Sequence, residues 1–549
     1  MSARRVVAWA LAALATARVG TAQSLGMAQG RDLPAWMTDW SPVDSHADLP
    51  RLLPSASDAI PLLLLPAPQV GLFWLAGNPG ALPAEVGPAY TTFMAAKASQ
   101  SGDYRRPLDP GGDALTQLSA LSWTPIGRRA AAIGRIVVDQ EPQDPGTYSD
   151  QAQPYTSNPF AVTDTAQSPM RQIRLRMEGA AASRVGAWGL GAALGYETRD
   201  NYTRHAAFTR LDRQVTSSGT LGVTRSFGDS GLVLGAHGRW SVGAETVNLS
   251  THPARGYVYQ LEGYADVPLQ VIYMYPAFYY RRLESDEVSG GGGASGTLAG
   301  ARWVVLAEAA RYRQGQWSVT GTDNPPEDHW ETHVWSVGGA VQRALGSLWL
   351  VTLQAHYTAL AGNGDLAADS GAVVFRARER ALTASAELRL LPTADGWTGV
   401  AVLSLLSDRR QRTDSVAGIG TDIRTLTPGI AVEAGRTVLK RFFVSAAAAY
   451  AEYSPTSTIP EPLARGAGYQ QMIAPEIEVE ATEASVYALS LSLRWQVRDG
   501  MAVWATARSE SLAPTAFGLQ LASGFRPNGT RTASDVVVGV SLEAANGER

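Results

Sequence analysis

The sequence predicts an all-β chain that forms a transmembrane antiparallel up-and-down β-barrel of about 20 strands, within limits of roughly 16 and 22. Two observations carry this prediction. Four apolar every-other-residue stripes begin and end on an aromatic residue, and the connections between strands are alternately short and long along the chain. Successive side chains of a strand point to opposite faces, so each stripe is one face of a β-strand.

The four stripes have a common length, which matches a membrane. In each of them the two aromatic residues are eight positions apart, at Trp188 and Tyr196, Trp349 and Tyr357, Phe442 and Tyr450, and Tyr487 and Trp495. Eight steps of about 3.3 Å at a tilt of about 40° give a height of roughly 20 Å, close to the apolar band between the aromatic girdles of an outer-membrane barrel. The opposite faces carry small and polar residues, such as Gly189 and Gly191. They suit a wet lumen or the solvent face of a soluble sandwich, and the aromatic bracketing favours lipid.

The connections give the strands a direction. Short turns are expected near 125–127, 184–185, 228–230, 265–269, 312–315, 344–346, 392–395, 437–439 and 498–500. Longer connections are expected near 101–112, 141–170, 199–217, 242–255, 283–298, 322–330, 360–372, 409–420, 454–476 and 512–533. Outer-membrane barrels have short periplasmic turns and long external loops. This orientation assigns Trp188, Trp349, Phe442 and Trp495 to the periplasmic girdle and Tyr196, Tyr357, Tyr450 and Tyr487 to the outer one.

Composition narrows the class of protein further. Hydrophobic residues make up 45% of the 549 residues and charged residues 17%, and only the N-terminus approaches the length of a membrane-spanning apolar run. A helical membrane protein is therefore excluded. A formal net charge of -4 points to no nucleic-acid partner, and the absence of cysteine excludes disulfides, thiolate metal sites and a lipidated cysteine anchor.

The sequence divides into three parts. Residues 1–22 have the features of an export signal, with a basic start at Arg4 and Arg5 and a small-residue cleavage site before Gln23. Residues 23–88 form a Pro-rich segment, which we interpret as a plug or hatch of the barrel or as a periplasmic extension, with an irregular tail as the alternative. Residues 89–545 form the barrel. Export combined with β-stripes predicts the outer membrane of a Gram-negative cell.

Two charged ladders lie near the predicted outer ends of strands. Arg376, Arg378 and Arg380 share a face with apolar residues of the same strand. Since arginine is costly within hydrocarbon, we expect them to stand above it and pair with glycolipid phosphates, or to form a solvated strand extension. Glu476, Glu478 and Glu480 are expected at the outer end of another strand, lining an external vestibule that favours cations unless arginines neutralise them.

No pattern of residues points to catalysis or to a cofactor. His329, Glu331 and His333 alternate beside Asp328, a spacing that could bind a metal, but a polar external rim is the favoured interpretation. No nucleophile-elbow spacing and no paired serine and histidine arrangement of the kind used by outer-membrane hydrolases is found. We therefore expect no enzyme activity, no metal and no cofactor.

A short motif resembles a known family. The segment Asn78-Pro79-Gly80-Ala81-Leu82 is similar to the Asn-Pro-Ala-Ala-Leu signature of long-chain fatty-acid transporter-type outer-membrane proteins, apart from Gly80. The hairpin from Leu121 to Ile136 and the overall layout also resemble a family of uncharacterised outer-membrane β-barrel proteins. The first resemblance implies that Asn78 and Pro79 belong to a hatch in the lumen, which in those transporters guards a path for a hydrophobic ligand.

Two classes of function remain open from the sequence. The first is a channel or transporter for an unidentified solute, with a hydrophobic one as a candidate, in which residues 23–88 plug a wide lumen. The second is a scaffold or export-complex component that binds a partner through its extracellular loops. Either would contact outer-membrane lipid and lipopolysaccharide and would be inserted by the barrel-assembly machinery, although the chain continues past its last strand as a polar tail without the usual terminal aromatic.

Overall fold

The computed structural model describes most of the chain between residues 71 and 543. The described ranges are 71–72, 77–84, 89–106, 111–149, 160–203, 208–228, 231–251, 258–262, 269–270, 277–318, 328–366, 372–393, 395–416, 418–439, 441–459, 469–517, 521 and 529–543. The predicted signal peptide at 1–22 and most of the segment 23–88 lie outside these ranges.

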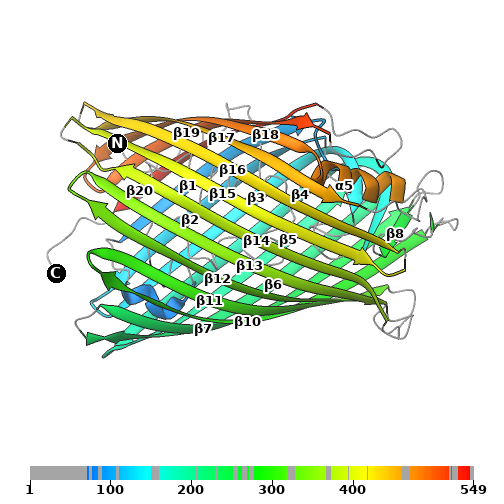
Figure 1. Ribbon diagram of the computed structural model, residues 1–549, viewed down its shortest axis with the longest axis horizontal. Helices are drawn as coiled ribbons and strands as arrows, with labels where there is room; N and C mark the ends of the chain where they lie inside the picture. Colours follow the sequence, from blue (N-terminus) through cyan, green and yellow to red (C-terminus); the bar gives the residue numbers. More distant parts are fainter. Residues whose placement is uncertain are drawn as a thin grey trace.

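Eighteen of the twenty strands in this part of the chain close into an antiparallel β-barrel, which confirms the predicted fold class. Strands that follow each other along the wall are paired, and the ring closes where β1 pairs with β20, from Tyr90 opposite Glu543 to Gly102 opposite Arg531. Figure 1 shows the strands tilted along the length of the barrel. The wall strands are β1 (Tyr90–Gly102), β2 (Gly112–Ile126), β3 (Ala130–Ser149), β4 (Phe160–Val185), β5 (Trp188–Thr203), β6 (Phe208–Phe227), β7 (Leu232–Thr251), β10 (Ala277–Leu298), β11 (Ala301–Ser318), β12 (Asp328–Leu345), β13 (Trp349–Leu366), β14 (Ala372–Leu390), β15 (Trp397–Asp414), β16 (Ile419–Val438), β17 (Phe442–Thr458), β18 (Glu483–Arg498), β19 (Met501–Ala516) and β20 (Arg531–Glu543).

The two ends of the barrel differ in their connections, as the sequence predicts. At one end the described connections are short, such as 186–187 and 391–396, and β1 begins and β20 ends there. Glycines at positive φ make these turns possible, for example Gly186 at 61° and Gly500 at 72°. The longest connections, 252–276 and 459–482, lie at the other end. We call the two ends the turn end and the loop end.

The two faces of the wall have the chemistry that the stripes predict. On β5, Leu190 and Leu194 are 52% and 68% exposed, while Ala193 between them is 2% exposed. Large apolar side chains are thus exposed on the outside of the barrel and small or polar ones face inward. A closed ring satisfies all backbone groups of the wall without an edge, which is the condition for crossing lipid with strands.

The structure corrects the predicted strand count in one region. The predicted loop at 283–298 is part of the wall strand β10, and the predicted turn at 312–315 lies within β11. The glycine run 290–293 resembles a loop in sequence, but at Gly291 an added Cβ would lie 2.7 Å from the His237 ring. The true turn at 299–300 places Ala299 at a φ of 50°, which its residue type does not signal. Two wall strands therefore replace four predicted ones.

The predicted turn at 265–269 belongs to a small hairpin outside the ring. Because β7 pairs directly with β10, β8 (Val258–Glu262) and β9 (Leu269–Gln270) are not wall strands. β8 instead pairs with the first residues of β4, at the loop end (Figure 1).

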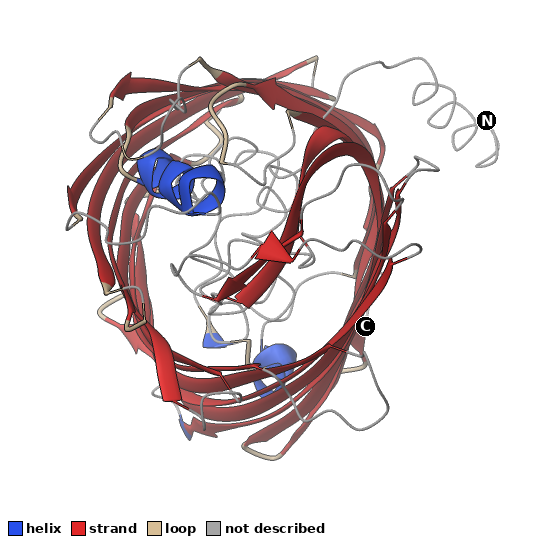
Figure 2. Cartoon of the chain, turned by 90° about the vertical axis from the view of Figure 1, so that its right-hand side faces the viewer, coloured by secondary structure: helices blue, strands red, loops and turns tan. Residues whose placement is uncertain are grey.

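Three helical segments accompany the wall: η5 (Pro79–Ala84), η8 (Tyr469–Ile473) and α5 (Ala474–Glu480). In the described residues, no helix has the length and apolar character needed to cross a membrane. Figure 2 shows helical segments inside the ring of strands, against its inner surface. η5 lies near the turn end and α5 lies at the loop end, so each end of the lumen has its own helical segment.

Candidate functional site

The segment around Asn78 is fastened to the inner wall near the turn end. The Asn78 side chain is 1% exposed and donates from Nδ2 to the carbonyl oxygens of Val223, at 3.2 Å, and Ala236, at 3.1 Å. Its Oδ1 accepts from the Gly80 amide at 2.9 Å, and the Thr224 hydroxyl donates to the Gly80 carbonyl at 2.9 Å. One amide side chain thus joins the segment to two wall strands, β6 and β7.

Wall glycines make this close approach possible. An added Cβ at Gly222 on β6 would lie 2.1 Å from Asn78 Oδ1, and one at Gly189 on β5 would lie 2.2 Å from the Gly80 carbonyl oxygen. Both distances are too short for any side chain larger than hydrogen. The sequence placed Gly189 on a small-residue luminal face, and the structure explains why this face is glycine-rich.

The second inward segment is α5, at the loop end. Pro475 stands in the first turn, where its missing N–H costs nothing, and Glu476 in the same turn suits the positive end of the helix. The π-turns of η8 precede it directly. Figure 2 shows this helix inside the ring of strands. It lies between β17 and β18 in sequence, so a connection of the loop end folds back into the barrel mouth.

An apolar cluster holds one side of α5. Ile473 and Ile477 are buried in a cluster that includes Trp330 of β12 and Phe375 of β14, whose ring centroids are 6.3 Å apart. Tyr469 at the start of η8 belongs to the same cluster. These five side chains contribute several kcal/mol of apolar burial, so the helix has a fixed position against the wall.

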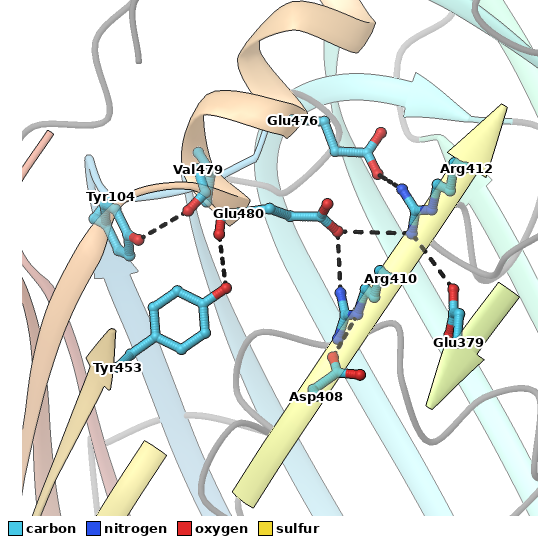
Figure 3. Close-up of polar contacts among 9 residues, drawn as sticks. All are labelled: Tyr104, Glu379, Asp408, Arg410, Arg412, Tyr453, Glu476, Val479 and Glu480. Carbon is cyan, nitrogen blue, oxygen red and sulfur yellow. Dashed lines mark hydrogen bonds and ion pairs between the residues drawn. The ribbon is translucent and has the colours of Figure 1, made fainter. Parts of the chain in front are cut away.

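Ion pairs hold the other side (Figure 3). Arg410 of β15 donates from Nη1 to Glu480 at 3.0 Å and from Nε to Asp408 at 2.8 Å. Arg412, two residues along the same face, donates from Nη1 to Glu476 at 3.2 Å. The side chains of Arg410, Arg412 and Glu480 are 14%, 9% and 7% exposed. We call these two arginines and two glutamates the α5 anchor.

Neighbouring groups complete the α5 anchor. Arg412 also lies 3.9 Å from Glu379 of β14. The Tyr453 hydroxyl donates to the Glu480 carbonyl at 2.7 Å and the Tyr104 hydroxyl donates to the Val479 carbonyl at 3.3 Å. Tyr453 of β17 and Tyr104, which follows β1, therefore add side-chain hydrogen bonds to the last two carbonyls of the short helix.

This arrangement corrects the sequence interpretation of the glutamate ladder. Glu476, Glu478 and Glu480 lie in a helix rather than at the end of a strand. The sequence did not show this because an alternation with apolar residues over five positions is too short to separate the period of a strand from that of a helix. Glu476 and Glu480 are paired with arginines instead of lining an open vestibule. The carboxylate of Glu478, itself 1% exposed, accepts from the Leu521 amide.

The anchor predicts a response to acid. Against the effect of burial, Arg412 and Arg410 lower the pKa of Glu480 below 4.5, whereas burial raises the pKa of Glu476. Because the pKa of Glu480 is lowered in the docked helix, Glu480 stabilises docking above its ordinary pKa and loses this contribution as the pH falls. The pKa of Glu476 is raised in the docked helix, so Glu476 can take up a proton in milder acid without weakening docking. We expect α5 to stay docked under mild acid and to release below pH 4.5, seen as a rise in single-channel conductance.

A non-titrating variant tests this assignment. Glu480→Gln cannot change its charge, so its conductance should vary much less with pH below 4.5 than that of the unaltered protein. If the conductance of Glu480→Gln rises in acid as much as that of the unaltered protein, a group other than Glu480 causes the release of α5.

Between the Asn78 segment and α5, the inner wall is polar, and its charged side chains pair with one another. Arg174 of β4 lies 2.6 Å from Asp139 of β3, which also accepts from Gln117 at 2.8 Å. Arg176 of β4 lies 2.8 Å from Glu197 of β5. Charges of both signs alternate along this face, as expected of a surface in contact with water.

The eight aromatic residues of the predicted girdles lie at two levels of the wall. Trp188, Trp349 and Phe442 are the first residues of their strands at the turn end. Phe442 stacks on Trp495 with ring centroids 5.9 Å apart. Towards the loop end, Tyr450 and Tyr487 are 5.0 Å apart, Tyr357 contacts Trp335 at 5.1 Å, and Tyr196 is 38% exposed. Their function as membrane girdles stays a prediction.

The remaining predicted residues lie on the outside of the wall near the loop end. Arg376, Arg378 and Arg380 are exposed on β14. On β12, the carboxylate of Glu331 lies 2.6 Å from Arg311 and 3.0 Å from His333. In the part of the chain that is described, no group of three or more histidine or acidic side chains has the geometry to hold a metal ion.

Sequence reasoning missed the basic half of the α5 anchor. Arg410 and Arg412 fall in the stretch 409–420, which was predicted to be a loop, whereas β15 continues to Asp414. The alternating pattern of Arg410 and Arg412 was the available signal, but the many charges in this stretch resemble a loop. Glu379 was hidden among the outward arginines of β14, although it faces the opposite side and is 1% exposed.

Comparisons with known proteins give a family. A protein family described as "Family of unknown function (DUF6850)" matches residues 82–542. No curated protein sequence matches the chain. Among solved structures, the siderophore receptor PiuA from Acinetobacter baumannii is similar with 9% identity and a TM-score of 0.39, covering 82% of this chain and 81% of that one. The ferric citrate transporter FecA is similar with 11% identity and a TM-score of 0.40, covering 82% and 78%.

The predicted relation to an uncharacterised family of barrels is confirmed, whereas the resemblance to fatty-acid transporter-type barrels through Asn78 and Pro79 is not shown.

Proposed function

We propose that this chain, which belongs to the family of unknown function DUF6850, is an outer-membrane channel or transporter whose lumen is narrowed at both ends by its own polypeptide. Outer-membrane placement is supported by the exposed apolar outer face, by the closed ring and by the contrast between short turns and long loops. In this orientation the turn end faces the periplasm and the loop end faces outside.

The size of the ring supports transport. Barrels of 16 to 18 strands leave an aqueous channel, whereas eight-stranded barrels are filled by side chains. This wall has 18 strands, and its inner face carries paired charges such as Arg176 and Glu197. A lumen of this size and polarity has room for a solute, and the polar lining favours a polar one.

The observation that carries the proposal is α5, a loop-end helix fixed inside the mouth by the α5 anchor. A scaffold that binds partners through its external loops gains nothing from folding one of them into the lumen. In a channel, such a segment limits the size of the solute that enters. The Asn78 segment is the corresponding element at the turn end, where we propose that it acts as a hatch.

Single-channel recording in planar bilayers tests this function. We expect a small conductance for the chain without its export signal and a larger one after deletion of residues 24–88, because the deletion removes the Asn78 segment from the inner wall. The far-ultraviolet circular dichroism of both proteins should show the same β-content. Electrical silence of both folded forms would contradict transport and favour a scaffold that binds a partner through its loops.

A further inference from the structure

The outer face of the barrel carries a patch of five arginines near the loop end. Arg376, Arg378 and Arg380 are exposed on β14, and Arg409 and Arg424 follow on β15 and β16. Arg380 is the register partner of Arg409, and Arg409 is the register partner of Arg424, so three arginines occupy directly opposite positions across three strands. We call these five residues the outer arginine patch.

The patch is not neutralised by the protein. Asp422 of β16 pairs with Arg409 at 2.6 Å and lies 3.6 Å from Arg424. Within the described residues, Arg376, Arg378 and Arg380 have no carboxylate partner. Like charges directly opposite each other on neighbouring strands destabilise a sheet. An external anion that binds there would therefore relieve the repulsion among five cations that a single carboxylate does not balance.

The patch begins where the apolar outer face ends. On β15, the outward residues Leu403 and Leu405 are 59% and 39% exposed, and on β14 Leu382 and Leu388 are 40% and 41% exposed. Arg409 stands four residues beyond Leu405, which at about 3.3 Å per residue and a tilt of about 40° is roughly 10 Å higher. The arginines thus lie above the hydrocarbon, at the level of lipid headgroups.

We propose that the outer arginine patch binds the phosphate groups of a bisphosphorylated glycolipid in the outer leaflet, while its acyl chains lie on the leucines below. Arginine is suited to this task because its planar fork donates two parallel hydrogen bonds to a phosphate. From Arg376 to Arg380 the patch extends about 13 Å along β14, enough to engage two separate phosphates. The proposal rests on the outer-membrane location and on no property of the lumen.

A charge-matched pair of variants tests the proposal. The test variant is Arg376→Ala with Arg378→Ala and Arg380→Ala in the full chain. The control is Arg128→Ala with Arg129→Ala and Arg343→Ala, which removes three exposed arginines at the turn end. Each purified protein is incubated in detergent with bisphosphorylated lipid A, with its dephosphorylated form or with phosphatidylglycerol, and the retained lipid is measured by native mass spectrometry.

The possible outcomes show which lipid supplies the anion. They also distinguish failure of the glycolipid proposal from failure of the proposed channel function. We expect the unaltered and control proteins to retain bisphosphorylated lipid A. The amount that the test variant retains should be about tenfold lower. Retention of the dephosphorylated form to the same extent, equal retention of phosphatidylglycerol, or an unaffected test variant would overturn the glycolipid assignment. Because the patch is outside the lumen, the test variant should keep its conductance, so failure here leaves the channel function standing.

Discussion

Replacement of both Arg410 and Arg412 by alanine is expected to release α5 from the barrel mouth and to raise single-channel conductance. The double change removes the two arginines that pair with Glu476 and Glu480 and leaves Arg106 as a remaining cation beside both carboxylates. Breaking a buried ion pair by removing one partner costs about 3–5 kcal/mol, and about 3 kcal/mol corresponds to more than a hundredfold change in the docking equilibrium. The pairings of β15 with β14 and β16 are unchanged, so the wall itself should stay folded.

Cysteine labelling measures the release directly. The chain contains no cysteine, so a single Ala474→Cys substitution reports on one position, which is 0% exposed in the docked helix. We expect a maleimide to react slowly with this cysteine in the otherwise unaltered protein and quickly in the Arg410→Ala, Arg412→Ala background. Arg174→Ala with Arg176→Ala is the matched control, since it removes two luminal arginines that do not contact α5. Equal protection of the cysteine in all three backgrounds would show that the anchor does not hold the helix.

The wall was predictable from sequence because membrane strands obey two local rules. Alternation of faces places Leu190 outside and Gly189 inside, and glycines at positive φ, such as Gly186 and Gly500, mark the short turns. Both signals are contained within a few neighbouring residues. The fold class and the direction of the strands therefore follow from the sequence.

The errors arose where a local signal has two physical explanations. The glycine run 290–293 is typical of a loop, but in β10 it leaves room for the His237 ring and for Leu72. A sequence gives no indication that another segment comes close to a wall position. The same limit explains why 409–420 was predicted to be a loop, although its Arg410 and Arg412 face α5.

The candidate site combines residues that are far apart in the chain. Arg410 and Glu480 are 70 positions apart, and Asn78 is 145 positions from Val223. The sequence marked Asn78 and the glutamates as unusual, yet it contained no information on their partners. Strand register, which the closed ring imposes on all wall strands together, brings the partners into reach.

Introduction of a valine at Gly222 is expected to displace the Asn78 segment from the inner wall. The first added atom would lie 2.1 Å from Asn78 Oδ1 and 2.7 Å from Pro79 Cδ, and the adjacent Gly80 amide would be 2.9 Å away. Because these neighbours include backbone and a ring, a small shift of a flexible side chain cannot relieve the overlap. The paired wall strands are held by many hydrogen bonds along their length, whereas the segment has only a few, so the segment should move.

The control for this variant uses a glycine on the same sheet that has space around it. At Gly238 on β7 an added Cβ would meet its nearest atom at 3.9 Å, so Gly238→Val changes the β-propensity of the wall without touching the segment. A cysteine at Ala81, which is 3% exposed, should become reactive to a maleimide in Gly222→Val and stay protected in Gly238→Val. If the hatch also limits the lumen, Gly222→Val should reproduce the larger conductance of the protein that lacks residues 24–88. Increased labelling without increased conductance would show that the contact at Gly222 holds the Asn78 segment against the wall but that the segment does not obstruct the channel.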